Sequence, residues 1–110
     1  RVRLSAIDAP EKRQAFGTRA KEALSDLCFG KIATVEVVDT DRYGRAVADV
    51  WCDGTYANEV MVEQGLAWVY RRYANGRVDL YAAEAAARAA GRGLWADPAP
   101  TPPWEFRHPK

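Results

Sequence analysis

Residues 32–52 read IATVEVVDTDRYGRAVADVWC. The two ends of this stretch, 32–38 and 46–52, are rich in β-branched residues, which favour strands. The segment 39–45 between them contains Gly44, and glycine is a common residue in turns. The stretch therefore predicts a β-hairpin with a longer loop.

The segments around the hairpin carry further strand and helix patterns. An apolar strand is expected at 2–7, and 66–70 has the pattern of an apolar exit strand or turn. Apolar residues recur at helical spacing in 16–27, 56–64 and 80–90. The sequence therefore predicts an α+β domain with three helices.

The composition is that of one ordinary globular domain. The chain has 110 residues, of which 48% are hydrophobic and 28% are charged. Its formal net charge of +1 excludes a polybasic protein that binds nucleic acid through bulk charge. Because the chain begins with Arg1 inside the expected first strand, we expect an upstream segment.

The last residues differ in composition from the rest. Five prolines occur in residues 98–110, so we expect an extended tail there, with Trp104 and Phe106 as anchors onto the body. The predicted division is a folded domain over 1–97 and a proline-rich tail over 98–110.

The two cysteines, Cys28 and Cys52, leave two interpretations open. They are too few for a zinc cluster. They form one disulfide if the protein is exported, or they are two small buried hydrophobic residues.

Charged residues occur at the end of the first expected strand and in the hairpin loop. Arg3, Asp8 and Glu11 surround one turn, and Arg45 closes the loop that begins at Asp41. Arginine forks bind two phosphate oxygens at once, and a carboxylate can accept a proton from water, so the set suits cleavage of a phosphodiester. Taken separately, the residues also fit structural roles: a helix-start capping box from Asp8 to Glu11, a salt bridge of Arg3, and a loop of solvated charges.

The order of these motifs resembles the thermonuclease family, whose fold is staphylococcal-nuclease-like, up to about Trp95. Arg3 matches the family's strand arginine, and Arg45 matches the arginine of its Asp-x-Tyr-Gly-Arg loop. Asp8 and Glu11 match the calcium aspartate and the glutamate of its Asp-x-Pro-Glu turn. Further matches are Asn58, 65–67 and 93–95.

The resemblance implies a mainly β fold, a five-stranded OB-type barrel with three helices. It also implies calcium-dependent hydrolysis of DNA and RNA to 3′-phosphate ends. In this scheme Arg3 and Arg45 clamp the phosphate, Glu11 acts as base or orients water, and Asp8 and the carbonyl of Ala9 bind Ca²⁺. The family also uses an aspartate from a hairpin ahead of this chain's first residue, so we expect the N-terminal strands to be missing here and the barrel to be open.

Substrate contacts and the setting of the reaction are further expectations. Tyr43, Tyr70 and Tyr73 are candidates for stacking on single-stranded DNA or RNA, with packing at the rim as the alternative. We expect a monomer, with a strand-exchanged oligomer as the alternative, in a secreted or periplasmic setting. A competing function is a catalytically inactive OB-type module that binds nucleic acid or protein.

Overall fold

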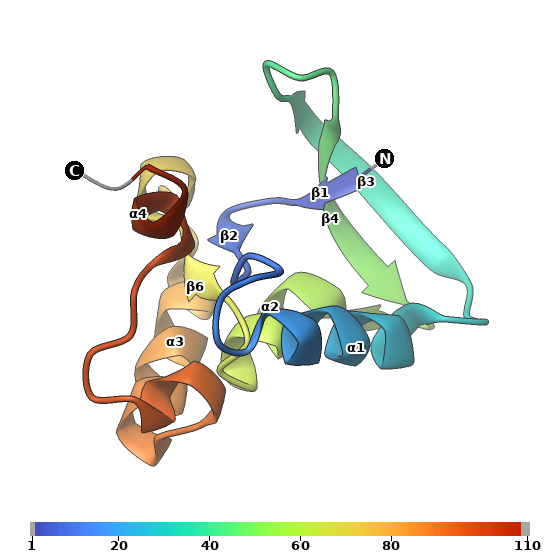
Figure 1. The fold of residues 1–110 in the computed structure, drawn as a ribbon. Helices are drawn as coiled ribbons and strands as arrows, with labels where there is room; N and C mark the ends of the chain where they lie inside the picture. The colour runs from blue at the N-terminus through green and yellow to red at the C-terminus, as the bar shows by residue number, and fades with distance from the viewer. Residues whose placement is uncertain (1, 109–110) are drawn as a thin grey trace.

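The computed structural model describes residues 2–108 and has an α+β fold (Figure 1). Two short 3₁₀ turns, η1 (Arg71–Tyr73) and η2 (Gly93–Ala96), accompany its strands and helices. In chain order the strands and α-helices are β1 (Val2–Leu4), β2 (Ile7–Asp8), α1 (Gly17–Cys28), β3 (Ala33–Thr40), β4 (Ala46–Cys52), β5 (Thr55–Tyr56), α2 (Ala57–Glu63), β6 (Trp68–Val69), α3 (Val78–Ala90) and α4 (Pro103–Arg107).

Strand β4 is the centre of the main sheet. It pairs in parallel with β1, where Val2 lies opposite Ala46, and antiparallel with β3. The register of β3 shifts between Val37 and Asp39, and β5 pairs with the far end of β4. The hairpin predicted for residues 32–52 is therefore confirmed. A second, two-stranded sheet pairs β2 antiparallel with β6.

The two sheets do not close into a barrel within residues 2–108. The strand order β1-β4-β3 leaves β1 and β3 as the edges of the main sheet. Strand β3 is exposed along its whole length. The arrangement is consistent with the open OB-like barrel that we expected.

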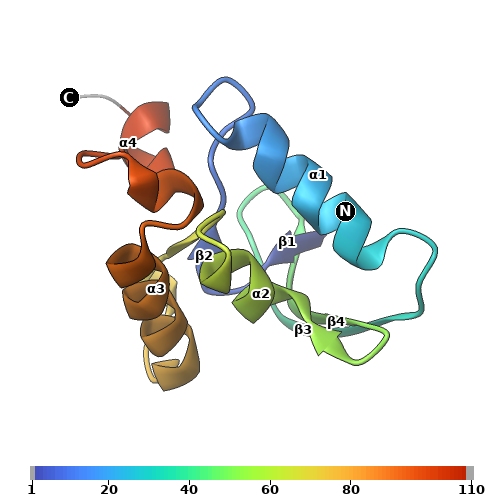
Figure 2. The ribbon, with the colours of Figure 1, turned by 90° about the horizontal axis from the view of Figure 1, so that it is seen from below.

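Helix α2 lies between α1 and α3 (Figure 2), and α3 also contacts β6. Helix α2 contacts α1, α3 and β4. Two apolar clusters result, one around β2, β6, α2 and α3, and one between β4 and α2. Their buried members include Ile7, Met61, Val62, Val69 and Leu80 in the first cluster, and Ala48, Val50, Cys52 and Ala57 in the second.

The first predicted strand, 2–7, is in fact two strands in different sheets. Ala6 has a positive φ of 65°, which turns the chain between them. Before the turn, Ser5 donates its N–H to the carbonyl of Ala48; after it, the carbonyl of Ala6 accepts from the N–H of Tyr70. The turn therefore carries the chain from the main sheet to the second sheet.

The prediction of an extended tail is wrong for its last described part, which forms α4. Pro103 is fully buried and stands in the first turn of this helix, where the fixed φ of proline is favourable. Trp104 stacks on Tyr70 with ring centroids 5.0 Å apart, so the expected anchoring role of Trp104 is confirmed. The described residues thus form four α-helices, where we expected three.

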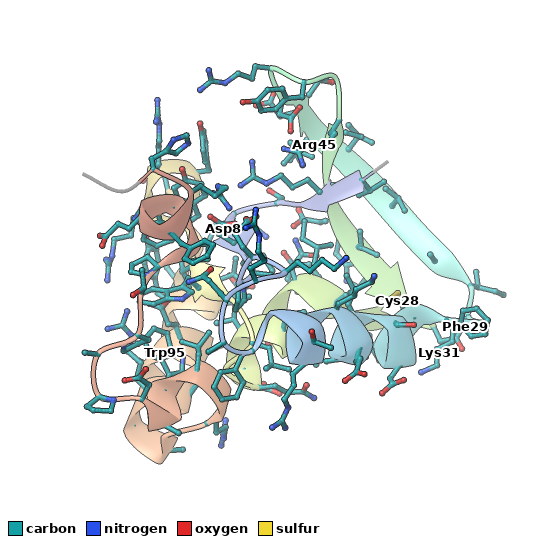
Figure 3. The ribbon with its side chains drawn as sticks, viewed as in Figure 1. Asp8, Cys28, Phe29, Lys31, Arg45 and Trp95 are labelled. Atoms are coloured by element: carbon teal, nitrogen blue, oxygen red, sulfur yellow. A yellow bond between two sulfur atoms is a disulfide. The ribbon has the colours of Figure 1, made fainter. Side chains whose placement is uncertain are left out.

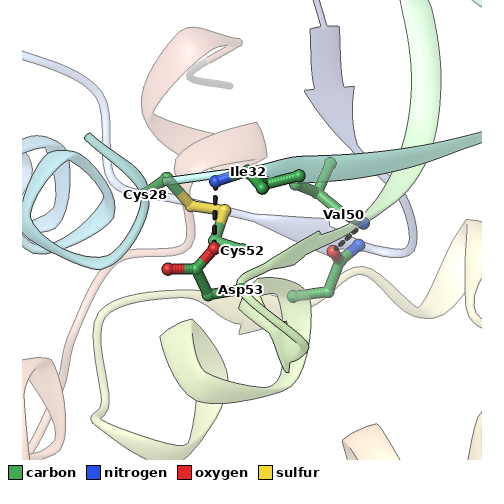
Figure 4. The surroundings of a disulfide bond; sticks show 6 residues. Cys28, Ile32, Val50, Cys52 and Asp53 are labelled. Atoms are coloured by element: carbon green, nitrogen blue, oxygen red, sulfur yellow. Dashed lines mark hydrogen bonds between the residues drawn. A yellow bond between two sulfur atoms is a disulfide. The ribbon is translucent and has the colours of Figure 1, made fainter. Parts of the chain in front are cut away.

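A disulfide joins the last residue of α1, Cys28, to the last residue of β4, Cys52 (Figure 4). Next to it, the Asp53 carboxylate accepts a hydrogen bond of 3.0 Å from the N–H of Ile32. Of the two interpretations of the cysteines, the disulfide is therefore the one observed.

Asn58, at the start of α2, is a buried link between strands β1 and β4. Its side chain has no exposed surface. Its Oδ1 accepts from the N–H of Val50 at 3.0 Å, and its Nδ2 donates to the carbonyls of Ser5 at 3.0 Å and Ala48 at 3.3 Å. One amide on α2 thus satisfies backbone groups of β4 and of Ser5, the residue after β1.

We expect Asn58→Ala to lower the free energy of unfolding by about 2 kcal/mol, because it leaves buried backbone groups without partners. Urea denaturation monitored by circular dichroism measures this. Asn75→Ala, in an exposed loop, is the matched control and should change stability by no more than about 0.5 kcal/mol. Equal stability of the two variants would mean that the Asn58 bonds contribute nothing net.

Candidate active site

The acidic part of the site lies where β2 ends. Asp8 is the last residue of β2, and its side chain is only 7% exposed. The guanidinium of Arg3, delivered by β1, approaches it with Nη2 3.8 Å from Oδ1. Ala9 and Glu11 follow in the loop before α1, and both are half-buried. The structure therefore places Arg3, Asp8, Ala9 and Glu11 in one region.

The capping-box alternative for Asp8 and Glu11 is wrong, because α1 begins only at Gly17. Glu11 instead belongs to a tight turn: its N–H donates to Gln14 Oε1 at 2.9 Å, and its carbonyl accepts from the N–H of Gln14 at 2.8 Å. The turn leaves the Glu11 carboxylate available to groups beside Asp8.

Arg107 of α4 bridges the two carboxylates, a contact that was not predicted from the sequence. Its Nη2 lies 2.7 Å from Asp8 Oδ2, and its Nη1 lies 3.2 Å from Asp8 Oδ1 and 2.5 Å from Glu11 Oε2. The hydrogen bonds to Asp8 raise the pKa of Arg107; burial opposes this rise, and the bond to Glu11 adds to it. The expected anchors at Trp104 and Phe106 were the only sequence signal that this segment docks on the body.

Arg45 lies at the end of the hairpin loop, apart from Asp8 (Figure 3). Tyr43 belongs to the same loop. The Nε of Arg45 donates to Asp41 Oδ2 at 2.7 Å, and the N–H groups of Tyr43 and Arg45 donate to Asp41 Oδ1. Desolvation acts to raise the pKa of Asp41, but the hydrogen bonds from Arg45 and Tyr43 outweigh it and lower the pKa. The loop therefore holds Arg45 through its own aspartate, and Arg45 would have to leave Asp41 to reach a phosphate near Asp8.

The three tyrosines have different surroundings. Tyr70 is half-buried: it stacks on Trp104, meets Tyr73 edge-on at 5.1 Å, and lies 5.8 Å below the guanidinium carbon of Arg3. Tyr73 and Tyr43 are 56% and 74% exposed. Tyr70 is therefore part of the wall behind Arg3, whereas Tyr73 and Tyr43 are mostly exposed, each with an arginine guanidinium over its ring.

The donors around Asp8 suit a hard divalent cation. Two carboxylates and the carbonyl of Ala9 offer oxygen ligands, the type that Ca²⁺ prefers. The Arg107 guanidinium already fills a cation position between the carboxylates. In the part of the chain described, no three His, Cys, Asp or Glu side chains gather as a metal site, so a bound ion would retain water ligands.

The sequence is similar to a family model and to several known proteins. Residues 1–97 match the family model described as staphylococcal nuclease homologue. The chain is 46% identical over 110 residues to a probable staphylococcal-like nuclease of Oryza sativa subsp. japonica, and covers 33% of that protein. It is 44% identical over 111 residues to an uncharacterized endonuclease of Escherichia coli O157:H7, covering 72% of it. It is 41% identical over 117 residues to a micrococcal nuclease of Shigella flexneri, where 97% of this chain covers 67% of the relative. The chain thus spans about a third of the length of the plant relative.

Proposed function

Because this chain belongs to the staphylococcal nuclease family, we propose that it is a calcium-dependent endonuclease that hydrolyses DNA and RNA to 3′-phosphate ends. The observation that carries the proposal is the meeting of Arg3, Asp8 and Glu11 around one cation position. A binding module alone has no need of a buried carboxylate that faces an arginine, with a second carboxylate joined to it through Arg107.

The proposed role of each site residue follows from its chemistry. Asp8 and the Ala9 carbonyl would hold Ca²⁺, which when bound supplies positive charge to offset the charge that develops on the phosphate. The Arg3 guanidinium, backed by Tyr70, binds phosphate oxygens from the side of β1. Arg45 binds them from the hairpin loop once it exchanges Asp41 for the substrate. The Glu11 carboxylate orients a water or accepts its proton.

The exposed rings of Tyr43 and Tyr73 are the proposed stacking positions for flanking bases. Tyr73 lies on η1, next to Tyr70, and Tyr43 lies in the hairpin loop, on the far side of the proposed substrate path from Asp8. Stacking of this kind needs unpaired bases, so we propose that single-stranded DNA and RNA are the preferred substrates of a monomeric enzyme.

We also propose a secreted or periplasmic setting. The support is the disulfide between Cys28 and Cys52, since such bonds persist in oxidising compartments. None of the helices among residues 2–108 is long and apolar enough to cross a membrane.

Incubation of end-labelled single-stranded DNA with the purified chain tests the function. We expect cleavage with Ca²⁺, products with 3′-phosphate ends, and no cleavage with chelator, because the arginines alone cannot offset the negative charge that develops on the phosphate. Glu11→Gln, prepared in the same way, controls for contaminating nucleases and should cut at least about 100-fold more slowly. Cleavage that persists in chelator would contradict the calcium requirement, and a folded protein that binds DNA without cutting it would favour the binding module.

A further inference from the structure

We propose that Arg107 is an internal competitor for the divalent cation: α4 places its guanidinium on Asp8 and Glu11, and metal binding must displace it. The inference rests on the proposed metal site at Asp8. It assigns to the C-terminal segment an autoinhibitory contact with that site.

The contact uses the oxygens that a metal ion would need. Both carboxylate oxygens of Asp8 accept from Arg107, at 2.7 and 3.2 Å, and Glu11 Oε2 accepts from the same guanidinium at 2.5 Å. Arg3 approaches Asp8 from another side, at 3.8 Å. While Arg107 stays in place, Asp8 thus has hydrogen-bond donors on both oxygens.

Because both are positively charged, the Arg107 guanidinium and a divalent cation cannot occupy the site together. Arg107 and Arg3 together balance the negative charges of Asp8 and Glu11. A divalent ion added to this balanced set would lie beside a guanidinium within a few ångströms, where like charges repel strongly outside bulk water. Metal binding therefore favours a state in which the Arg107 side chain has left the carboxylates.

The helix that carries Arg107 is held in place by other contacts. Pro103 is fully buried, and Trp104 packs between Tyr70 and Trp68, stacked on the first and edge-on to the second at 5.5 Å. Upstream, Gln14 Nε2 donates to the carbonyl of Thr101 at 2.8 Å. Because these contacts do not involve the guanidinium, Arg107 can rotate away while α4 remains docked. Its side chain is 30% exposed, so solvent is within reach.

Isothermal titration of Ca²⁺ into the full chain and into Arg107→Gln tests the inference. Arg107→Gln removes the competing charge and keeps most of the side-chain length. We expect it to bind Ca²⁺ about tenfold more tightly than the parent, which corresponds to about 1.4 kcal/mol. Arg19→Gln is the matched control, since it removes the same charge from an exposed position on α1 and should bind Ca²⁺ as the parent does.

A second variant keeps the test valid if Arg107→Gln does not fold. Arg107→Lys keeps the charge but cannot bridge both carboxylates with one planar fork, so its affinity should lie between those of the parent and Arg107→Gln. Thermal melts confirm folding of each variant. Equal or weaker binding by a folded Arg107→Gln, an equal gain in Arg19→Gln, or absence of calcium binding by parent and variant alike would overturn the inference.

The cleavage assay separates this failure from failure of the proposed function. Calcium-dependent cutting together with equal calcium affinities of parent and Arg107→Gln would support the proposed nuclease function and contradict the competition by Arg107. Absence of both cutting and calcium binding would contradict the proposed nuclease function as well as the competition by Arg107.

Discussion

Arg3→Ala and Arg45→Ala should each lower the rate of DNA cleavage at least about 100-fold, the usual scale for removing one group that stabilises developing charge. Arg3 stands beside Asp8, with its guanidinium above the ring of Tyr70. This fixed position suits an arginine that meets the phosphate as it arrives. Its loss removes a clamp and leaves the fold unchanged, because Arg3 lies on an edge strand and is half-buried.

Arg45 acts from a different element and therefore tests the same chemistry independently. In the free protein its Nε is bound to Asp41, so substrate has to draw it across from the hairpin loop. Arg42→Ala is the matched control: Arg42 lies in the same loop, is exposed, and has its guanidinium over the ring of Tyr43. We expect the control to cleave within a few-fold of the parent.

Single-turnover cleavage of a labelled oligonucleotide at saturating Ca²⁺ measures these rates, and circular dichroism verifies the fold. A parent-like rate in Arg3→Ala or in Arg45→Ala would exclude that arginine from the reaction. A loss as large in Arg42→Ala would instead show that the charge of the loop as a whole matters.

Replacement of Cys28 and Cys52 together by alanine should lower the free energy of unfolding by about 3.5 kcal/mol, from the chain entropy of a loop of this length. The two residues are 24 apart in the sequence. For a domain of 110 residues, such a change lowers the melting temperature by about 15 °C. Alanine avoids placing a hydroxyl at Cys52, which is 1% exposed.

Calorimetry with and without reductant checks this prediction. Reductant should lower the melting temperature of the parent toward that of the double variant and leave the double variant unchanged. A double variant that melts within about 3 °C of the oxidised parent would show that the bond contributes little to stability.

The regular elements were predictable because each one is encoded by its own residues. The hairpin follows from the β-branched runs at 32–38 and 46–52, and α1 and α3 follow from apolar residues at helical spacing. The break at Ala6 was not predictable, because alanine rarely has a positive φ and only the pairing of its two neighbours with different sheets requires it there. Helix α4 was missed for a related reason: its stability comes from Trp104 on Tyr70, a contact across the chain.

The site shows the same division between local and distant information. Arg3, Asp8 and Glu11 are close in sequence, and the structure places Arg3 beside Asp8 and links Asp8 to Glu11 through Arg107. Arg107 joins them from 99 positions beyond Asp8, and a single arginine in a proline-rich tail carries no pattern that identifies its partner. The distance between Arg45 and the acidic cluster likewise depends on how far the hairpin extends from β1, which spacing in the sequence does not specify.

The parallel pairing of β1 with β4 has a consequence for the order of folding. Strands β3 and β4 are joined by a short loop, and hairpins of this kind form within about 1–10 μs. In the sequence, α1 and β3 separate β1 from β4. The pairing of β1 with the other edge of β4 therefore closes a much longer loop and is slower. Because β1 and the segment that follows it deliver Arg3 and Asp8, we expect the hairpin to form early and the cluster of Arg3, Asp8 and Glu11 to be among the last parts of the molecule to assemble.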